Sequence, residues 1–226
     1  VQSLTYAVTT GAISNALICV TVNWRPTVDA VTSITFDGST LTNSGTVRNL
    51  APSNTNLRYL VLGTITAGSK NVVVSTTNDT GDASNWIASG AVVISGAAQT
   101  TPQDATQSGT GTGATASVSI TTVEDGDAIF EAIGTNNSGG LGMIAQTNRV
   151  QNHLFNPVTS RVDGSGMSRL ITKSPAGAQT LNWDNGGGGD DWALWAAAFK
   201  PAAGPPDLIG SFSLTQSGGM IGRRYI

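Results

Sequence analysis

The sequence predicts an all-β protein folded as a two-sheet sandwich. Of its 226 residues only 11% are charged and 28 are glycine, and Ser, Thr and Asn supply most of the remaining polar positions. This composition is typical of strands and tight turns. Short apolar stretches also follow one another between turn residues, and none of them shows a convincing helical period. The length suits one large all-β domain or two small ones, and one domain is the simpler interpretation.

The first half of the chain contains five predicted strands. They are expected at residues 16–24, 33–36, 57–65, 71–76 and 86–95. Asp37 and Gly38 form a turn signal directly after the second of them. The last of the five, from Trp86 to Ile94, is apolar on both alternating faces, which indicates a strand in the middle of a sheet with packing on both sides.

A Gly- and Thr-rich stretch at 106–114 is expected to separate this half from the second. Six further strands are predicted at 115–123, 127–134, 143–151, 168–174, 179–183 and 192–200. The strand from Trp192 to Phe199 is again apolar on both faces, so it should be central. In contrast, Val118 and Ile120 alternate with Ser and Thr, the pattern of a half-exposed strand.

Three segments carry a resemblance to a known fold. They are Ser33-Ile-Thr-Phe-Asp-Gly-Ser-Thr-Leu41, the run from Gly90 to Pro102 with Asp104 after it, and Asp191-Trp-Ala-Leu-Trp-Ala-Ala-Ala-Phe-Lys-Pro201. Together they resemble a jelly-roll β-sandwich domain of phage structural proteins and bacterial surface proteins, over residues 1–201. The resemblance implies the fold more than a function, since similar sandwiches serve as lectins, carbohydrate-binding modules and virion or surface subunits.

The end of the chain is predicted to form an arm that extends from the sandwich. Residues 1–200 are the predicted sandwich body, 201–206 (Pro-Ala-Ala-Gly-Pro-Pro) a linker, and 207–226 a C-terminal assembly arm. Within the arm, residues 207–216 alternate as a strand does, with Leu208, Phe212 and Leu214 on one face. Because a lone strand needs a sheet to join, we expect it to pair with a neighbouring copy. Folding back onto its own body would argue against assembly.

Charge and cysteine content exclude several functional classes. The net charge is −3 and the eleven Lys and Arg are scattered, so we expect no nucleic-acid partner. No apolar run approaches the roughly 18 residues of a membrane-spanning helix. Cys19 is the single cysteine, which rules out an intramolecular disulfide and a cysteine-based zinc site and indicates core packing.

One Asp- and Gly-rich loop is a candidate binding site. Asp184, Asp190 and Asp191 flank four consecutive glycines, and clustered carboxylates on a flexible loop are the oxygen ligands that Ca²⁺ prefers. The alternative is an ordinary turn, since turns are rich in Asp, Asn and Gly for backbone reasons. Trp183, directly before the loop, is expected to be exposed and is the candidate glycan contact.

The search for catalytic residues gives no convincing constellation. His153 is the sole histidine, and the sequence singles out no Ser and Asp to complete a triad with it. Asp127 and Glu131 share one side of a predicted strand and would suit glycan cleavage only if both faced a cleft. We would discard that hypothesis if both pointed into the core. The sequence thus predicts a protein that is not an enzyme and has no resident cofactor.

These observations favour a structural subunit that self-assembles by strand addition. The expected partner is the protein itself, as an oligomer or polymer joined through the arm, in an extracellular filament, on a cell surface or in a virion. The alternative is a carbohydrate-binding, lectin-like module with a site at Trp183 and the loop that follows it.

Overall fold

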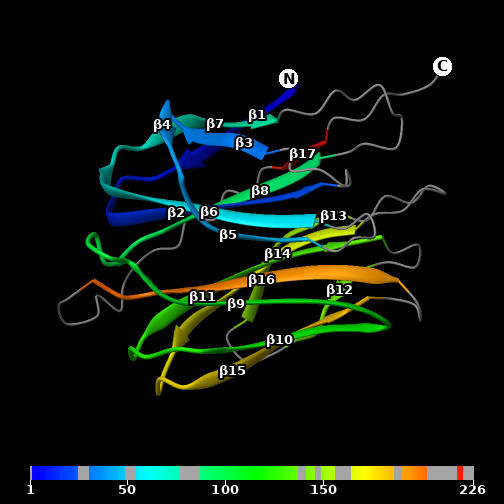
Figure 1. The fold of residues 1–226 in the computed structure, drawn as a ribbon. Coiled ribbons are helices and arrows are strands. Elements are labelled where there is room, and N and C mark those ends of the chain that lie inside the picture. Colours follow the sequence, from blue (N-terminus) through cyan, green and yellow to red (C-terminus); the bar gives the residue numbers. More distant parts are fainter. Residues whose placement is uncertain are drawn as a thin grey trace.

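The protein, described from a computed structural model, consists of antiparallel sheets stacked face to face (Figure 1). The structure describes residues 2–24, 31–48, 54–76, 87–136, 141–145, 149–155, 164–185, 190–202 and 218–220. Within these residues there are four sheets, none of them closed, and no helix. The all-β prediction is confirmed, whereas the expected pair of sheets is in fact a stack of four.

The first half of the chain supplies two of the four layers. The outer sheet has the order β1-β7-β3-β4 and consists of β1 (Gln2–Thr10), β7 (Gly68–Thr76), β3 (Val31–Phe36) and β4 (Ser39–Thr40). The inner sheet has the order β17-β8-β2-β6-β5 and consists of β17 (Gly218–Met220), β8 (Ile87–Ile94), β2 (Ile13–Trp24), β6 (Asn54–Ile65) and β5 (Thr42–Arg48).

The second half supplies the other two layers. Its inner sheet has the order β13-β14-β11-β16-β9 and consists of β13 (Arg149–Phe155), β14 (Gly164–Lys173), β11 (Asp127–Thr135), β16 (Asp191–Phe199) and β9 (Gln103–Thr112). Its outer sheet has the order β10-β15-β12 and consists of β10 (Thr115–Thr121), β15 (Ala178–Asp184) and β12 (Gly142–Met143).

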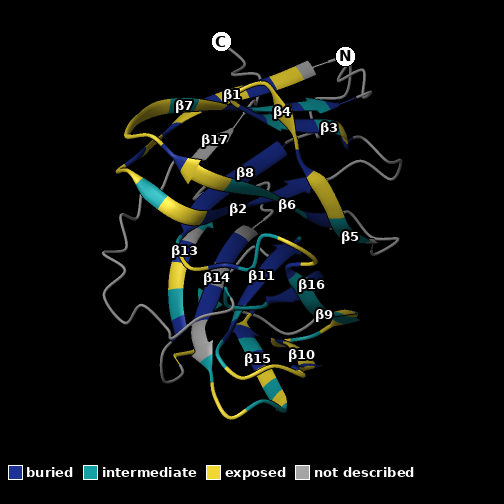
Figure 2. Cartoon of the chain, turned by 90° about the vertical axis from the view of Figure 1, so that its left-hand side faces the viewer, coloured by how far each residue is buried: buried dark blue, intermediate teal, exposed yellow. Residues whose placement is uncertain are grey.

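Burial follows the layers (Figure 2). Every residue of β8 is buried, as are most of β2, β11 and β16. These strands belong to the two inner sheets, which are packed on both faces, so the prediction of central, doubly apolar strands is confirmed. β10 alternates exposed and buried residues along its whole length, as its sequence predicts for a strand of an outer sheet.

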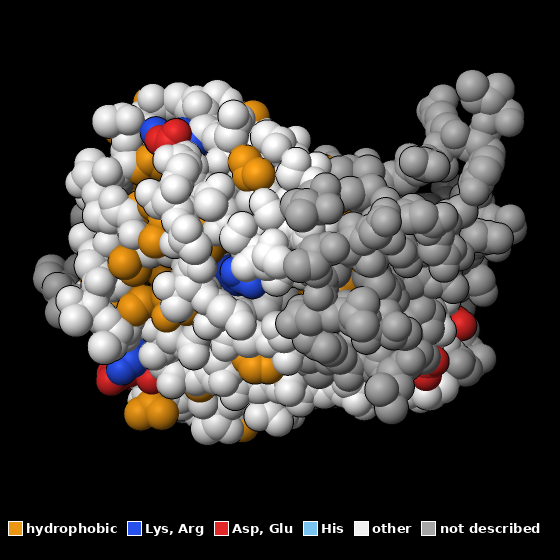
Figure 3. Space-filling model, turned by 45° about the horizontal axis from the view of Figure 1, so that its top comes forward, with side chains coloured by type: hydrophobic (Ala, Val, Ile, Leu, Met, Phe, Trp, Pro, Cys, Tyr) orange, Lys and Arg blue, Asp and Glu red, His pale blue; other side chains and the backbone are white. Residues whose placement is uncertain are grey.

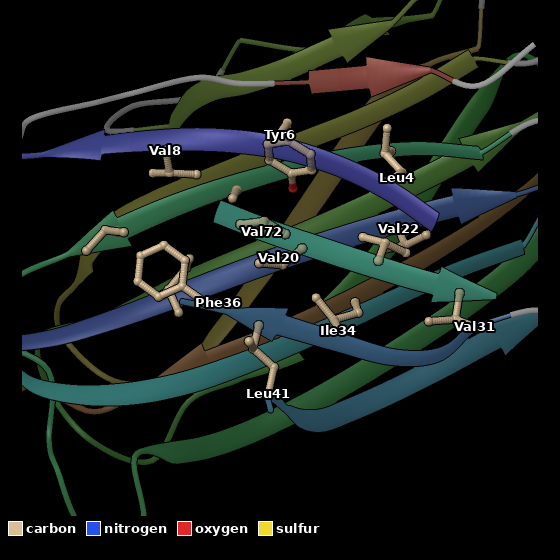
Figure 4. Packing of buried hydrophobic residues seen from close by; sticks show 14 of the residues in the cluster. Leu4, Tyr6, Val8, Val20, Val22, Val31, Ile34, Phe36, Leu41 and Val72 are labelled. Atoms are coloured by element: carbon tan, nitrogen blue, oxygen red, sulfur yellow. The ribbon is translucent and has the colours of Figure 1, made fainter. Parts of the chain in front are cut away.

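Three apolar cores lie between the four layers. In the first, side chains of β1, β3 and β7 meet those of the inner sheet, as Tyr6, Val20, Val72 and Phe36 show (Figure 4). The third joins the inner and outer sheets of the second half. The middle core joins the two inner sheets to each other.

This middle core is built around an aromatic contact. The ring of Phe199 meets Tyr59 edge to face, with centroids 5.0 Å apart, and meets Phe130 at 5.8 Å. Tyr59 comes from the first half and the two phenylalanines from the second. Leu17, Val92 and other buried residues pack around them, so the halves are joined by an apolar interface of the kind found inside a domain.

The two halves share one plan. The inner sheet of the first half has the order β17-β8-β2-β6-β5, and that of the second half, given from its other edge, has the order β9-β16-β11-β14-β13. Strands at the same position in these two orders are matched. For all but the first position, the matched strands also follow the same order along the chain. The first position is filled by β9, which precedes its half, and by β17, which comes from the C-terminus.

The segments that follow β8 and β16 confirm this relation. Ala97 forms a bridge with Pro201, and the N–H of Ala202 donates to the carbonyl of Gly96 at 2.7 Å. When Ile94, the last residue of β8, is matched with Phe199, the last residue of β16, residues 96 and 97 correspond to residues 201 and 202. Corresponding residues therefore pair antiparallel, and this relates the halves by an approximate two-fold axis. Pro201 and Ala202, predicted as linker, belong to this folded contact.

Two sequence predictions of local structure were wrong. The stretch expected to separate the halves is largely β9, because its glycines serve packing: a Cβ at Gly111 would lie 2.7 Å from the Trp192 ring, and Gly109 also lies against that ring. The strand expected at 143–151 is instead split between β12 and β13, which belong to different sheets.

Gly134 tests the close approach of the two halves. A Cβ at this position would lie 2.9 Å from the backbone oxygen of Asn54 and 3.3 Å from Oδ1 of Asn23, both in the first half. We expect Gly134→Ala to lower the free energy of unfolding by about 1–3 kcal/mol, because backbone must shift to admit the methyl group. Urea unfolding followed by tryptophan fluorescence measures the change.

Gly11→Ala is the matched control, since a Cβ there meets nothing within 4 Å. Its stability should stay within about 0.5 kcal/mol of the wild type. Equal stability of the two variants would contradict the tight contact at Gly134.

Candidate functional site

The Asp- and Gly-rich loop closes one end of the second half through hydrogen bonds. The carboxylate of Asp191 accepts from Thr112 Oγ1 at 2.7 Å, and its backbone N–H donates to Asn136 Oδ1 at 2.7 Å. Buried Asn185 donates to the carbonyls of Gly113 and Asp190 at 3.0 and 3.1 Å. These contacts tie the ends of β9, β11, β15 and β16 together, which is what short polar side chains do in turns.

The calcium prediction rests on three carboxylates of this loop. Asp184 is exposed at the end of β15, whereas Asp190 and Asp191 are half-buried. Among the described residues, no group of three or more His, Cys, Asp or Glu is placed to hold a metal ion. The structure thus gives the loop a role in joining strands and does not bring its three aspartates together as a metal centre.

A buried ion pair lies between the inner and outer sheets of the second half. The guanidinium of Arg149 donates to Glu131 Oε1 through Nε at 2.7 Å and also through Nη2, and the two side chains are 0% and 1% exposed. Nη1 of Arg149 donates to the carbonyls of Ile144 and Asn182. One cation therefore links β11, β13 and the outer sheet.

Trp183 belongs to the same cluster. Its ring lies under the Arg149 guanidinium, 5.3 Å from the centroid, a cation–π contact. It also packs against Gly166, where a Cβ would lie 2.6 Å from the indole. Trp183 is fully buried, so the prediction that it is exposed was wrong, and it is not available to stack on a sugar. The apolar ring shields the ion pair from water instead.

The two carboxylates considered for glycan cleavage are also buried. Asp127 is 0% exposed and Glu131 is 1% exposed, and Glu131 is engaged by Arg149. Both side chains are therefore buried, and this burial argues against the glycan-cleavage hypothesis. His153 lies in β13, and its side chain is outside the described residues.

A second cluster of charged groups lies near the starts of β9 and β11 and the end of β16, away from the Asp- and Gly-rich loop. Asp104 of β9 and Asp127 of β11 are accompanied by Glu124 and Lys200, and Lys200 Nζ lies 3.7 Å from Asp104 and 3.9 Å from Glu124. The N–H of Val123 donates to Asp104 Oδ2 at 2.7 Å. The carboxyl group of Asp127 faces that of Asp104, with which it shares a hydrogen bond when one of the two is protonated.

These surroundings shift the pKa values of Asp104 and Asp127 in opposite directions. Burial, then the neighbouring Asp104 and Glu124, raise the pKa of Asp127 to about 7, and Lys200 opposes the change only in part. Burial also disfavours the charged form of Asp104, but the hydrogen bonds from Val123 and its other neighbours outweigh it and lower the pKa. The pair therefore holds one proton over a range of several pH units.

The edge of β8 is a third feature. β8 pairs with β2 over Ile87–Ile94 on one side. On the other side β17 pairs antiparallel with it, placing Gly218, Gly219 and Met220 opposite Gly90, Ser89 and Ala88. The described part of the C-terminal segment thus returns to its own chain. Leu208, Phe212 and Leu214 lie outside the described residues.

No family model matches the chain, and a search of curated proteins finds no significant match. Within its described part, the chain has no helix long and apolar enough to cross a membrane.

The Asp127 carboxyl predicts a pH dependence of stability. Its pKa is raised in the folded state from about 3.9 in the unfolded chain, so the folded state binds one proton more between these values. Stability contributed by that proton is complete below pH 4 and is lost as the pH rises to about 7. The unfolding equilibrium constant should rise by up to tenfold per pH unit across this window.

Asp127→Asn removes this titration while keeping the side-chain volume. Urea unfolding of both proteins at pH 4.5, 6.0 and 7.5 should show the mutant gaining stability relative to the wild type as the pH rises. Asp104, whose pKa is lowered, loses its contribution only below about pH 4 and so does not interfere. Parallel pH profiles would contradict the protonated state of Asp127.

The ion pair predicts a non-additive response to substitution. Arg149→Met leaves Glu131 as a buried carboxylate without its cation and should cost about 3–5 kcal/mol of stability. Adding Glu131→Leu should recover a large part of that loss, because no buried charge then remains. Chemical unfolding of the single and double variants measures the coupling, and additive losses would show that the pair is not coupled.

Proposed function

We propose that this protein is a structural subunit that assembles with copies of itself by strand addition. In the assembly, the C-terminal segment of one copy completes the inner sheet of the next copy at β8. Within one chain, the pairing of Gly218–Met220 with β8 is the folding back that argues against assembly. It supports the proposal because it makes this edge an acceptor of the segment, which a second copy can supply by exchange. The subunit would act in an extracellular filament, on a cell surface or in a virion, with a jelly-roll type of sandwich as its building unit.

The same contact can be made within one chain or between two. Residues 203–217 separate the folded contact at Ala202 from β17, and a connection of this length allows exchange of the terminal strand. A strand that completes its own sheet closes the protein as a monomer, whereas the same strand given to a neighbour links copies head to tail. Such links continue into a fibre or shell unless rotation closes them as a ring.

The surface supports the same proposal. On the face shown in Figure 3, the described surface is mostly uncharged, with Lys, Arg, Asp and Glu in small groups. Neutral polar surfaces of Ser, Thr and Asn can pack against one another with little cost in charge desolvation. The stacked sheets, with apolar cores between them, supply a rigid body for such packing.

Truncation tests whether the C-terminal segment is the connector. We expect the full chain to form ordered polymers and a version ending at Ala202 to remain unassembled, as seen by negative-stain microscopy and size-exclusion chromatography. The end point keeps the contact of Ala202 with Gly96. If both versions stay monomeric, the assembly proposal fails.

Disulfide trapping separates exchange between copies from closure within one. In a Cys19→Ala background, one chain carries Ala88→Cys and another Met220→Cys, positions that lie opposite each other in the β8–β17 pair at a separation suited to a disulfide. Mixing them during assembly should give a covalent dimer. Val123→Cys, 73% exposed, replaces Met220→Cys as the control for random collision. Trapping only when one chain carries both cysteines would contradict exchange.

A further inference from the structure

We infer that the outer edge of β8 is a strand-binding site, and that its ligand is the C-terminal segment of this protein, residues 207–226. The site should hold this segment much as β16 holds β9. This inference concerns the site and its ligand, whichever copy supplies the segment, so it stands apart from the proposed assembly.

The β16 edge shows what the matching position accepts. There β9 pairs antiparallel with the whole strand, from Asp191 opposite Thr112 to Phe199 opposite Gln103, with one irregularity near the end. β9 follows the first half in the chain and completes the inner sheet of the second half. By the approximate two-fold relation, the segment that follows the second half is placed to complete the inner sheet of the first.

The burial of β8 shows that its outer edge is not a solvent-facing one. All eight of its residues are buried, as in a strand with neighbours on both sides. Among the described strands, β17 is its neighbour on the outer side and pairs with three residues, Ala88–Gly90. The ladder on β16 is three times as long, so β8 can bind a longer strand than β17.

The C-terminal segment shares a four-residue sequence with β9. Thr106-Gln-Ser-Gly109 lies within β9, and Thr215-Gln-Ser-Gly218 runs into the start of β17. Taking Ile94 as the counterpart of Phe199, Gly90 corresponds to Trp195, which lies opposite Ser108. Gly90 itself lies opposite Gly218. The structural register and the motif alignment therefore agree to within one residue.

The composition of both segments suits binding through the backbone. Gly109 and Gly111 allow β9 to lie against the Trp192 ring, and the motif alignment places Gly218 of the C-terminal segment at the position of Gly109. In strand addition, main-chain hydrogen bonds supply the affinity and alternate side chains the specificity. A short Gly-containing strand with few side chains can thus approach a buried edge closely.

The experiment uses a chain ending at Ala202 and a fluorescent synthetic peptide of residues 207–226. Fluorescence anisotropy should show saturable binding to the truncated chain. A Gly219→Pro peptide, which loses a backbone donor, should bind at least about tenfold more weakly, whereas the Gly219→Ala control, which keeps the N–H, should bind more tightly than the proline peptide. A scrambled peptide should not bind.

A truncated chain that keeps its near-UV circular dichroism but does not bind the peptide, or that binds the scrambled peptide equally well, overturns the inference. If truncation prevents folding, a protease site within residues 203–206 lets the full chain fold before it is cut. The labelled peptide should then exchange into the cut protein, and failure to exchange over days, in the presence of excess peptide and after partial unfolding in urea, overturns the inference. Binding by the truncated chain together with a monomeric full chain would overturn only the assembly proposal.

Discussion

The apolar contact between the two inner sheets is the constraint on which the rest of this structure depends. Phe199, Phe130 and Tyr59 meet there, and Leu17, Val92 and Met167 pack around them. Each inner sheet must therefore be apolar on both faces, since its other face covers a core of its own. This requirement explains the long buried runs in β2, β8, β11 and β16, and the glycine at position 134, where the backbones of the halves approach closely.

A stack of two similar halves determines where sheet edges occur. In each inner sheet, four strands occur in the same chain order in both halves, and the fifth strand, at one edge, does not. This edge strand is β9 in the second half and β17 in the first. The first of these is fixed by the chain, because β9 continues into β10. The second, β17, belongs to the C-terminal segment that we propose is exchanged between copies. While a strand covers such an edge, the backbone groups of the edge are paired. When the strand is absent, these groups can pair with another chain, and this connects the fold to the proposed role in assembly.

The charged residues of the second half show how environment decides the meaning of a carboxylate. Glu131 and Asp127 lie four residues apart on one strand, yet Glu131 binds Arg149, which stacks over an indole ring, whereas Asp127 lies beside another carboxyl group. The first arrangement stabilises a charge in the interior through hydrogen bonds and a cation. The second is satisfied by retaining a proton. Both carboxyl groups are buried.

Much of the secondary structure followed from local pattern. Alternation and turn residues correctly predicted most strands, the Asp37-Gly38 turn and the half-exposed face of β10. The alternation of Leu4, Tyr6 and Val8 in β1 was also available, although this strand was not predicted. The failures are those in which a residue makes a contact with a part of the chain far away in sequence. Gly111 was predicted to lie in the stretch between the halves, whereas in the structure it packs in β9 against the Trp192 ring.

The all-β class and the central position of β8 and β16 could be predicted from sequence alone, because the alternation of apolar and polar residues is a property of neighbouring positions. The repetition of Thr-Gln-Ser-Gly was equally present in the sequence, although its meaning depends on knowing that β9 completes an inner sheet. The number of layers, the burial of Trp183 and the partner of β8 became known from the three-dimensional structure. These depend on pairings between residues far apart in the chain, and local pattern carries no information on which strand edge another segment will meet.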